Sequence, residues 1–475
     1  MTIVFYLTLH IIGLLCVWPL SRKLPRWFLV STGFVWGLLL WMFSSLVTLF
    51  FNLSYSWLNM GLIILPLLAI AIYYNVKNRT FSLSTNDITL ILGSILALAF
   101  LSYLLGKTSY VYATTDSFNY IYHGKILAKS GLAPWAVTQF TKLGSFSSII
   151  QMTSYLLPGE YLSGYQTILV VILILVLFIG MLEQLKKDFS PIMSVIATAS
   201  MILVLGSVTF QHHIFYIHNN LPAGLMLFLA LYSFWHYYKN SVGEWNLLGI
   251  IALIGFSFTR IEGPLYAILI LLFLISIKPQ SYKKILGQVL PYTSATLFWH
   301  IYLLTNALQN EALSQTNLLL IITALAGLTI LALISKWIPT IINILPEVLL
   351  SIMFFSVLLS IIIETEHMIT SITHLWQNLT NTFIWSWTWF IALAFLPVLL
   401  KDNQEHPEKR LLLYSLAGYI LIVLLLVLAR IPFRLGQTDS ANRLMLQILP
   451  VIFYGIATSS RTLKLWFFPD TDIPS

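Results

Sequence analysis

The sequence has 475 residues, of which 58% are hydrophobic and only 9% are charged. Soluble globular proteins carry about 25% charged residues, so this composition excludes an ordinary soluble fold and favours a protein embedded in lipid. The net charge of +8 fits lysine and arginine retained on cytoplasmic loops, and it does not point to a nucleic-acid partner. A single cysteine, Cys16, excludes an intrachain disulfide and a thiolate metal cluster.

Apolar runs recur along the whole chain. A membrane-spanning helix needs about 20 mostly apolar residues, and on this basis we predict an all-α fold, a polytopic bundle of about 13 to 15 transmembrane helices. In chain order the runs are 2–20, 27–49, 56–74, 88–105, 164–182, 191–209, 220–237, 245–258, 262–277, 286–304, 317–335, 342–363, 383–400, 411–429 and 442–458. The short runs 245–258 and 262–277 form either a hairpin of tilted helices or one broken span.

Basic residues in the loops predict the orientation of the bundle. With the N-terminus outside, the cytoplasmic loops carry 17 lysines and arginines and the outer loops carry 8. We therefore divide the chain into N-terminal accessory helices (1–87), a transmembrane core (88–458) with a large outer loop (106–163), and a short cytoplasmic tail (459–475). The expected location is the plasma (inner) membrane.

The outer loop 106–163 holds the first candidate site. From Phe118 to Ser130, apolar and cationic residues recur at helical spacing, which predicts an interfacial helix that lies along the membrane surface. Asp116 and Ser117 precede this stretch and suit the capping of its first turn. A carboxylate at the membrane surface can also act as a general base toward an acceptor hydroxyl, and the two roles are compatible.

Arginines form a second candidate site near the last helix. Arg430, Arg434 and Arg443 lie on the predicted outer side, against the positive-inside trend, and a planar guanidinium suits phosphate oxygens. Contact with lipid head groups or pairing with Asp439 explains Arg430 and Arg434 equally well. Arg443, at the start of the last helix, is the stronger candidate for binding phosphate.

Two further groups of polar residues interrupt the apolar runs. Arg260 and Glu262 either neutralise each other in a tight turn or line a cavity within the membrane. His212, His213 and His218 suggest a metal site, but their spacing matches no metal motif with a known mechanism. We therefore predict no metal ligand set and leave a divalent cation open as a cofactor.

The outer loop resembles a known element. In integral-membrane glycosyltransferases of the GT-C fold, the first outer loop has an acidic residue, then Tyr or Tyr-His, then a short helix that ends in glycine. The similar stretch here reads Asp116-Ser-Phe-Asn-Tyr120-Ile-Tyr-His123-Gly-Lys125 and continues to Gly131. Three more elements follow in the family's order: Asn219-Asn220-Leu-Pro222 where many members have Asn-Asp-x-Pro, Arg260-Ile-Glu262-Gly263 for Lys/Arg-Pro-Glu-Gly, and Asn442-Arg443-Leu through Pro450 for the Arg-Tyr…Pro entry of the last helix.

The resemblance, which covers roughly 88–458, implies a GT-C-like catalytic core and transfer of a hexose or pentose. The donor would be a polyprenyl-phosphate sugar, and the acceptor would be an envelope glycan, lipid or protein on the extracytoplasmic face. The implied roles are Asp116 as general base, Arg443 on the lipid phosphate with Arg260 and Arg434 beside it, and Tyr120, His123, Lys125, Glu262, His213 and Asn220 in the substrate groove.

Two other classes of function stay open at this stage. A polymerase or ligase of surface polysaccharides also uses outer arginines and a lipid-linked sugar, but it would not need Asp116. A lipid or solute transporter would show internal repeats and charges near the bilayer midplane. We find no repeat by inspection, and the candidate charges lie toward one face. A purely structural membrane subunit remains the alternative without chemistry.

Overall fold

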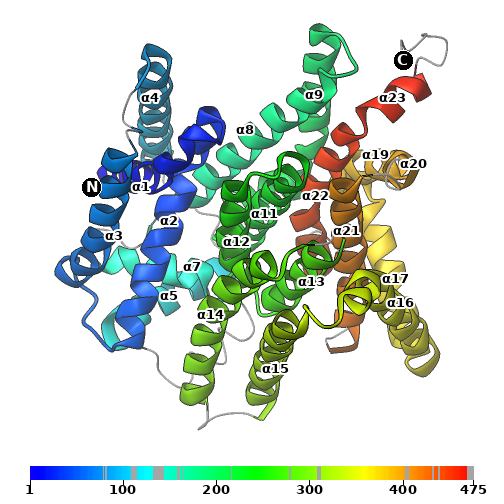
Figure 1. Cartoon of the computed structure of the whole chain (residues 1–475). Helices are drawn as coiled ribbons and strands as arrows, with labels where there is room; N and C mark the ends of the chain where they lie inside the picture. The colour runs from blue at the N-terminus through cyan, green and yellow to red at the C-terminus, as the bar shows by residue number, and fades with distance from the viewer. Residues whose placement is uncertain are drawn as a thin grey trace.

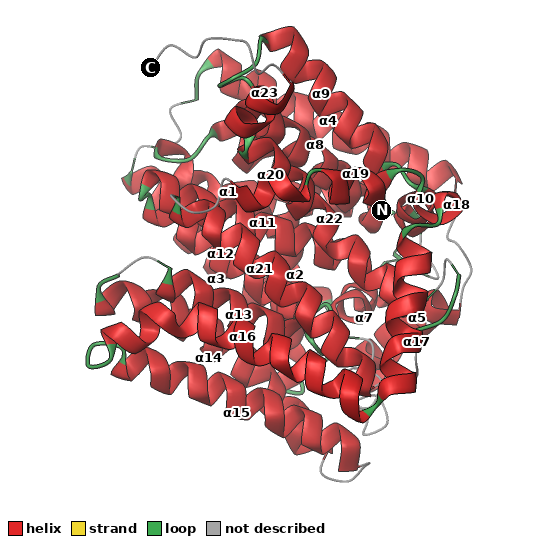
Figure 2. Ribbon diagram, turned by 90° about the vertical axis from the view of Figure 1, so that its right-hand side faces the viewer, coloured by secondary structure: helices red, strands yellow, loops and turns green. Residues whose placement is uncertain are grey.

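Every regular element in the described part of the chain is a helix (Figures 1 and 2). The computed structural model describes residues 1–78, 80, 83–108, 115–131, 144–157, 161–162, 164–215, 217–277, 280–307, 312–401, 406–429, 433–436 and 439–467. Much of the predicted outer loop 106–163 and the end of the tail, 468–475, lie outside these residues.

The chain begins with a group of long helices and continues through a segment of short ones. The N-terminal helices are α1 (Thr2–Val17), η1 (Trp18–Arg22), α2 (Arg26–Phe50), α3 (Trp57–Lys77) and α4 (Thr85–Thr108). The short segment holds α5 (Thr115–Ser130), α7 (Phe146–Gln151) and η2 (Met152–Tyr155).

The remaining helices form the core and its far side. They are α8 (Tyr165–Leu185), α9 (Pro191–Leu205), α10 (Val208–Ile214), α11 (Asn220–Asn240), α12 (Gly243–Ser257), α13 (Gly263–Ser276), α14 (Tyr282–Ala307), α15 (Ala312–Ile334), α16 (Pro339–Ile363), α17 (Thr365–Leu379), α18 (Thr382–Trp385), α19 (Thr388–Ala394), α20 (Leu396–Lys401), α21 (Pro407–Leu426), η3 (Val427–Ala429), α22 (Ser440–Thr458) and α23 (Ser460–Phe467). The predicted tail thus begins as helix α23.

The predicted apolar runs are helical, but fewer of them are single spans than we expected. Among the described residues, nine helices are long and apolar enough to cross a membrane, or ten if the bent pair α9–α10 is one span. The run 191–209 breaks at Gly206 and Ser207, where α9 and α10 meet at 76°. The run 383–400 divides into α18, α19 and α20. These two breaks correct the prediction of one continuous helix for each run.

Helix α11 lies in the middle of the bundle, with the N-terminal helices on one side and α21 and α22 on the other (Figure 1). Its polar residues keep it below the hydropathy of a typical span, yet nearly all of its side chains are buried. A helix that is shielded from lipid by its neighbours does not need an apolar surface of its own. Its position explains why a relatively polar helix occupies the centre of the molecule.

Helices α1 and α2 approach each other at glycines. A Cβ atom added to Gly13 would lie 1.9 Å from the carbonyl oxygen of Gly33, and one added to Gly37 would lie 1.8 Å from that of Leu9. Only glycine permits this backbone contact, as in other membrane helices with small residues four positions apart. Helices α1 and α2 are therefore closely packed against each other.

The stretch predicted as an interfacial helix in the loop 106–163 is helical in the structure, as α5. Its outward face carries Phe118 and Tyr122, which are 60% and 59% exposed, whereas Tyr120 and Leu127 on the opposite face are 1% exposed. In Figure 2, helices α5, α10, α17 and α18 lie toward the right-hand edge of the molecule, and α23 lies at the top, to their left. Because α5 is exposed on one face only, it can cover the ends of the core helices at that edge.

The turn between α12 and α13 is covered by the segment that precedes α7. The backbone N–H groups of Ser145 and Phe146 both donate to the carbonyl of Phe258, at 3.0 and 2.9 Å. Gly144 has a φ of +78°, and a Cβ atom there would lie 2.1 Å from the carbonyl oxygen of Thr259. Backbone contacts therefore hold residues 144–146 against the α12–α13 turn.

Candidate functional site

Three segments that are distant in the sequence meet at the carboxylate of Asp116. Arg443 donates from Nη1 to Oδ2 of Asp116 at 2.8 Å, across 327 positions of the chain. The ring atom Nε2 of His218 lies 3.6 Å from the same oxygen. Both members of the ion pair remain partly accessible, with 29% of the Asp116 side chain and 23% of the Arg443 side chain exposed.

The local structure explains how each charge reaches this point. Asp116 lies in the first turn of α5, where the partial positive charge of the helix end favours a carboxylate. Arg443 lies in the first turn of α22. Asp439 caps this helix, because its Oδ1 atom accepts a hydrogen bond from the backbone N–H of Ala441 at 2.8 Å. Asp439 also accepts from the backbone N–H of Arg434 at 3.0 Å, so this carboxylate shapes the loop through backbone N–H groups.

Hydrogen bonds to Asn219 and Gln166 hold His218 in one orientation. Its Nδ1 accepts from the backbone N–H of Asn219 at 2.9 Å, so the ring proton of the neutral form lies on Nε2 and faces Asp116. The side-chain amide of Gln166 contacts both the carbonyl and the N–H of His218. Arg443 Nη1 also lies 3.1 Å from Nε2. Arginine can only donate, so with the ring proton on Nε2 this contact is not a hydrogen bond, and both N–H groups face the shared carboxylate.

The pKa values of this group follow from burial and charge. Burial lowers the pKa of His218 to about 4, Asp116 opposes this shift, and Arg443 adds to it. His218 and Arg443 together hold the pKa of Asp116 well below its usual range, although partial burial opposes them. At neutral pH, Asp116 is therefore ionised and His218 neutral. A carboxylate held in this way is a weak base, which matters for any catalytic role.

A second ion pair lies behind the first. Arg260 donates from Nε to Glu262 at 2.6 Å, and its Nη1 contacts the side-chain oxygen of Asn220 at 3.3 Å. Only 10% of the Arg260 side chain and 2% of the Glu262 side chain are exposed. Gln447 on α22 also approaches Asn220, at 3.5 Å. The sequence offered two interpretations of this pair, mutual neutralisation in a tight turn or the lining of a cavity within the membrane. In the structure Arg260 and Glu262 neutralise each other in the α12–α13 turn.

Three consecutive residues, 218–220, join the two ion pairs. His218 faces Asp116, Asn220 faces Arg260, and Asn219 between them contacts the hydroxyl of Tyr120 at 3.4 Å. The Asn219 side chain also accepts from the N–H of Ser147 at 2.9 Å. The Tyr120 ring packs edge-on against His218, and burial raises the pKa of its hydroxyl above the ordinary range. This segment therefore ties α5, α7 and α11 into one site.

The other predicted site residues lie on α5, on α10 and in the loop before α22. Lys125 is half-buried on the outward face of α5, nine positions from Asp116, or about 13 Å along the helix. His123 is buried on the opposite face of α5, and burial lowers its pKa. His213 hydrogen-bonds the carbonyl of Thr209 at 2.7 Å. Arg434 is exposed, with its backbone bonded to Asp439 and Asn378, and Arg430 lies outside the described residues.

His218 and Gln166 are the residues that the sequence did not single out. His218 was visible there only as one of three clustered histidines, which suggested a metal site. In the described part of the chain, no three His, Cys, Asp or Glu side chains are grouped to hold a metal ion. The useful signal was the polar run His218-Asn219-Asn220 at the entry to the buried helix α11, where each residue has its own partner.

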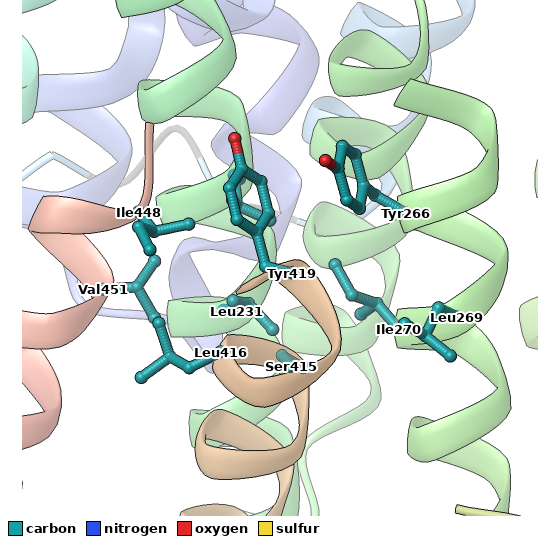
Figure 3. Close-up of a pocket in the computed structure, with 10 residues that line it drawn as sticks. Leu231, Tyr266, Leu269, Ile270, Ser415, Leu416, Tyr419, Ile448 and Val451 are labelled. Carbon is teal, nitrogen blue, oxygen red and sulfur yellow. The ribbon is translucent and has the colours of Figure 1, made fainter. Parts of the chain in front are cut away.

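A small void lies between α11, α13, α21 and α22 (Figure 3). Its volume of about 10 Å³ is close to that of a single water site. Tyr266 and Tyr419 stack beside it with ring centroids 4.5 Å apart, and the Tyr419 hydroxyl contacts Gln447 at 3.0 Å. A sugar or a phosphate does not fit this void.

No family model, no curated protein and no solved structure matches the chain. The class of protein is defined by the fold alone. The chain is an integral membrane protein, all-helical in its described part, with nine or ten candidate spans.

Proposed function

We propose that this protein is a membrane glycosyltransferase that moves a sugar from a polyprenyl-phosphate carrier to an acceptor hydroxyl on the extracytoplasmic face. One observation carries the proposal. A carboxylate from α5 and an arginine from α22, predicted separately as base and phosphate ligand, lie 2.8 Å apart at a partly exposed edge of the bundle. A general base and a phosphate-binding cation must act on atoms of one reacting centre, so their proximity is what this reaction requires.

The reaction assigns one task to each charge. Asp116 takes the proton of the acceptor hydroxyl as the acceptor oxygen bonds to the anomeric carbon of the sugar. The bond between that carbon and the phosphate oxygen breaks, and polyprenyl phosphate leaves with the bonding electron pair. Arg443 stabilises the charge that develops on the phosphate. Its Nε–H is buried and has no hydrogen-bond partner in the described part of the chain, which leaves a donor for an incoming anion.

The ion pair must open before the reaction can start. While Arg443 holds Asp116, the carboxylate is too weakly basic to accept a proton efficiently, and the arginine is occupied. A donor phosphate offers Arg443 a second anion. In our proposal the phosphate draws Arg443 away and releases Asp116 to act as a base. Donor binding would thus precede activation of the acceptor.

Transfer and binding measurements on purified protein in lipid nanodiscs test this proposal. The donors are a panel of polyprenyl-phosphate monosaccharides, and a crude membrane extract supplies acceptors. We expect Asp116→Asn to lower turnover by about 100-fold to 10,000-fold, the usual contribution of a general base, while the donor still binds. We expect Arg443→Ala to lose donor binding.

A second ion pair provides the matched control. The side chains of Arg410 and Glu347 form an ion pair at 3.0 Å and, like Asp116 and Arg443, are partly exposed, at 36% and 46%. Both residues are more than 200 positions from Asp116 in the sequence. Arg410→Ala and Glu347→Gln should leave both donor binding and turnover unchanged. A wild-type protein that binds no lipid-linked sugar would refute the proposal and favour transport. Turnover that survives Asp116→Asn would mean that another group is the base.

A further inference from the structure

His218 contacts the candidate base, yet the reaction just proposed gives it no task. It differs from Arg443 in accessibility and in how firmly it is held. Only 4% of the His218 side chain is exposed, and its ring and backbone are fixed by Asn219 and Gln166. Arg443 is 23% exposed and sits on a long, flexible side chain. The N–H donor of His218 is therefore fixed, whereas that of Arg443 can move.

This difference has an energetic consequence when Arg443 leaves. Asp116 is partly buried, and a buried carboxylate without a hydrogen-bond donor is costly. The Nε2–H of neutral His218 already points toward Oδ2 from 3.6 Å, and a small shift of the freed carboxylate brings it within hydrogen-bond distance. His218 can then replace part of what Arg443 supplied. The neutral ring does so without the full charge that makes Asp116 a weak base.

We propose that His218 is a positioning residue. Its Nε2–H holds the Asp116 carboxylate in place when Arg443 turns to an anionic ligand, and it thereby lowers the cost of separating the ion pair. The inference rests on the proposed function, because it takes the ligand to be a lipid phosphate. It adds a residue that acts on phosphate binding through Asp116, without touching the phosphate itself.

The charged and titratable groups around His218 limit how it can act. Asp116 and Tyr120 face it from α5, Arg443 from α22, Arg260 from the α12–α13 turn, and His213 from α10. Two arginines and burial disfavour a second proton on the ring, and its Nδ1 is occupied as an acceptor. The ring is therefore a fixed donor at neutral pH and not a proton carrier.

A double-mutant cycle on ligand binding separates this role from a merely structural one. The probe is a polyprenyl phosphate without sugar, titrated onto the full-length protein in phosphatidylcholine nanodiscs. His218→Leu removes this donor, and we expect it to weaken binding of the probe about tenfold, because Asp116 then loses the His218 hydrogen bond when the ion pair opens. In the Asp116→Asn background the same substitution should change affinity less than twofold, because there is no carboxylate to hold.

Two further variants keep the experiment decisive. His218→Gln places an N–H donor near the position of Nε2 and should restore most of the lost affinity and turnover. His218→Asn can still accept from the N–H of Asn219 but falls short of Asp116, so it tests the same bond if His218→Leu does not fold. Loss of affinity with Asn and recovery with Gln would support the inference.

The possible failures are distinguishable. If Arg443-dependent binding is present and His218→Leu leaves it unchanged, or weakens it equally with Asp116 and with Asn at that position, the inference is wrong and the proposed function stands. If wild-type protein shows no Arg443-dependent binding of polyprenyl phosphate, the proposed function fails and the inference fails with it.

Discussion

While Asp116 and Arg443 are paired, neither side chain is available for the role proposed for it. Arg443 keeps the Asp116 carboxylate ionised but weakly basic, and Asp116 occupies the arginine that a phosphate would need. This conflict predicts opposite effects on binding and on chemistry when one partner is neutralised. A site in which Asp116 served only to cap α5 would not couple the two measurements.

At the residue scale, Asp116→Asn should therefore tighten phosphate binding while it lowers the rate of transfer. Removing a partly exposed ion pair frees Arg443, and pairs of this kind contribute on the order of 1 kcal/mol. We expect the affinity for polyprenyl phosphate to rise about threefold to tenfold. Titration of the phosphate onto nanodiscs measures this, with Glu347→Gln as the control. Weaker binding would show that Asp116 helps to hold the ligand and does not compete with it.

His218 also predicts a pH dependence of stability. Its pKa is about 4 in the folded protein and near 6.5 in an unfolded chain, so the unfolded state binds more protons between these values. Stability contributed by the neutral ring is complete above pH 6.5 and is lost as pH falls toward 4. Between pH 7 and pH 5 the loss is about 2 kcal/mol.

The measurement is the change in Tm between pH 7 and pH 5 at constant ionic strength. His218→Gln should reduce this change, because glutamine takes up no proton. His406→Gln is the matched control, since His406 is 53% exposed and distant from the site. An equal effect of both substitutions would contradict the pKa shift assigned to His218.

At the scale of elements, one added methyl group at Gly144 should disrupt the contact between residues 144–146 and the α12–α13 turn and lower the stability of the protein. Gly144→Ala places a Cβ atom 2.1 Å from the Thr259 carbonyl oxygen on a backbone with positive φ. We expect a loss of about 2 to 4 kcal/mol, from strain and displacement of the turn together. Gly61→Ala on α3 is the control, because no atom lies within 4 Å of the new Cβ and alanine favours a helix. Thermal unfolding of both variants measures the difference.

The elements also divide into those that the sequence predicts and those that it does not. The spacing of Phe118, Tyr122 and Lys129 was enough to predict the exposed face of α5, because a helix repeats every 3.6 residues. The break at Gly206 and Ser207 was missed because the run 191–209 stays apolar through it. Apolar composition reports burial in lipid and does not report the direction of the chain.

Distances between elements are a different kind of information. The basic loops placed Asp116 and Arg443 on one side, but only the packing of α5 and α22 around residues 218–220 brings them to 2.8 Å. Arg260 pairs with the buried Glu262, a contact that the sequence offered as one of two interpretations of this turn. The sequence shows which charges share a face, and close packing decides which of them touch.

At the scale of the whole molecule, both proposals require that the α5 edge faces away from the cytoplasm. In Figure 2, α5 lies toward the right-hand edge and α23 lies at the top, to its left, so the predicted side of each helix can be tested separately. The single cysteine makes this simple. Cys16→Ser gives a background without thiols, into which one exposed position at a time can be introduced as cysteine.

We expect Ser130→Cys, at the exposed end of α5, to react with a membrane-impermeant maleimide in intact cells. Arg461→Cys, exposed on α23, should react only after the membrane is permeabilised. The physical basis is the excess of lysine and arginine on the C-terminal side, which retains those loops in the cytoplasm. The reverse labelling pattern would place Asp116 and Arg443 in the cytoplasm, where the proposed extracytoplasmic transfer could not occur.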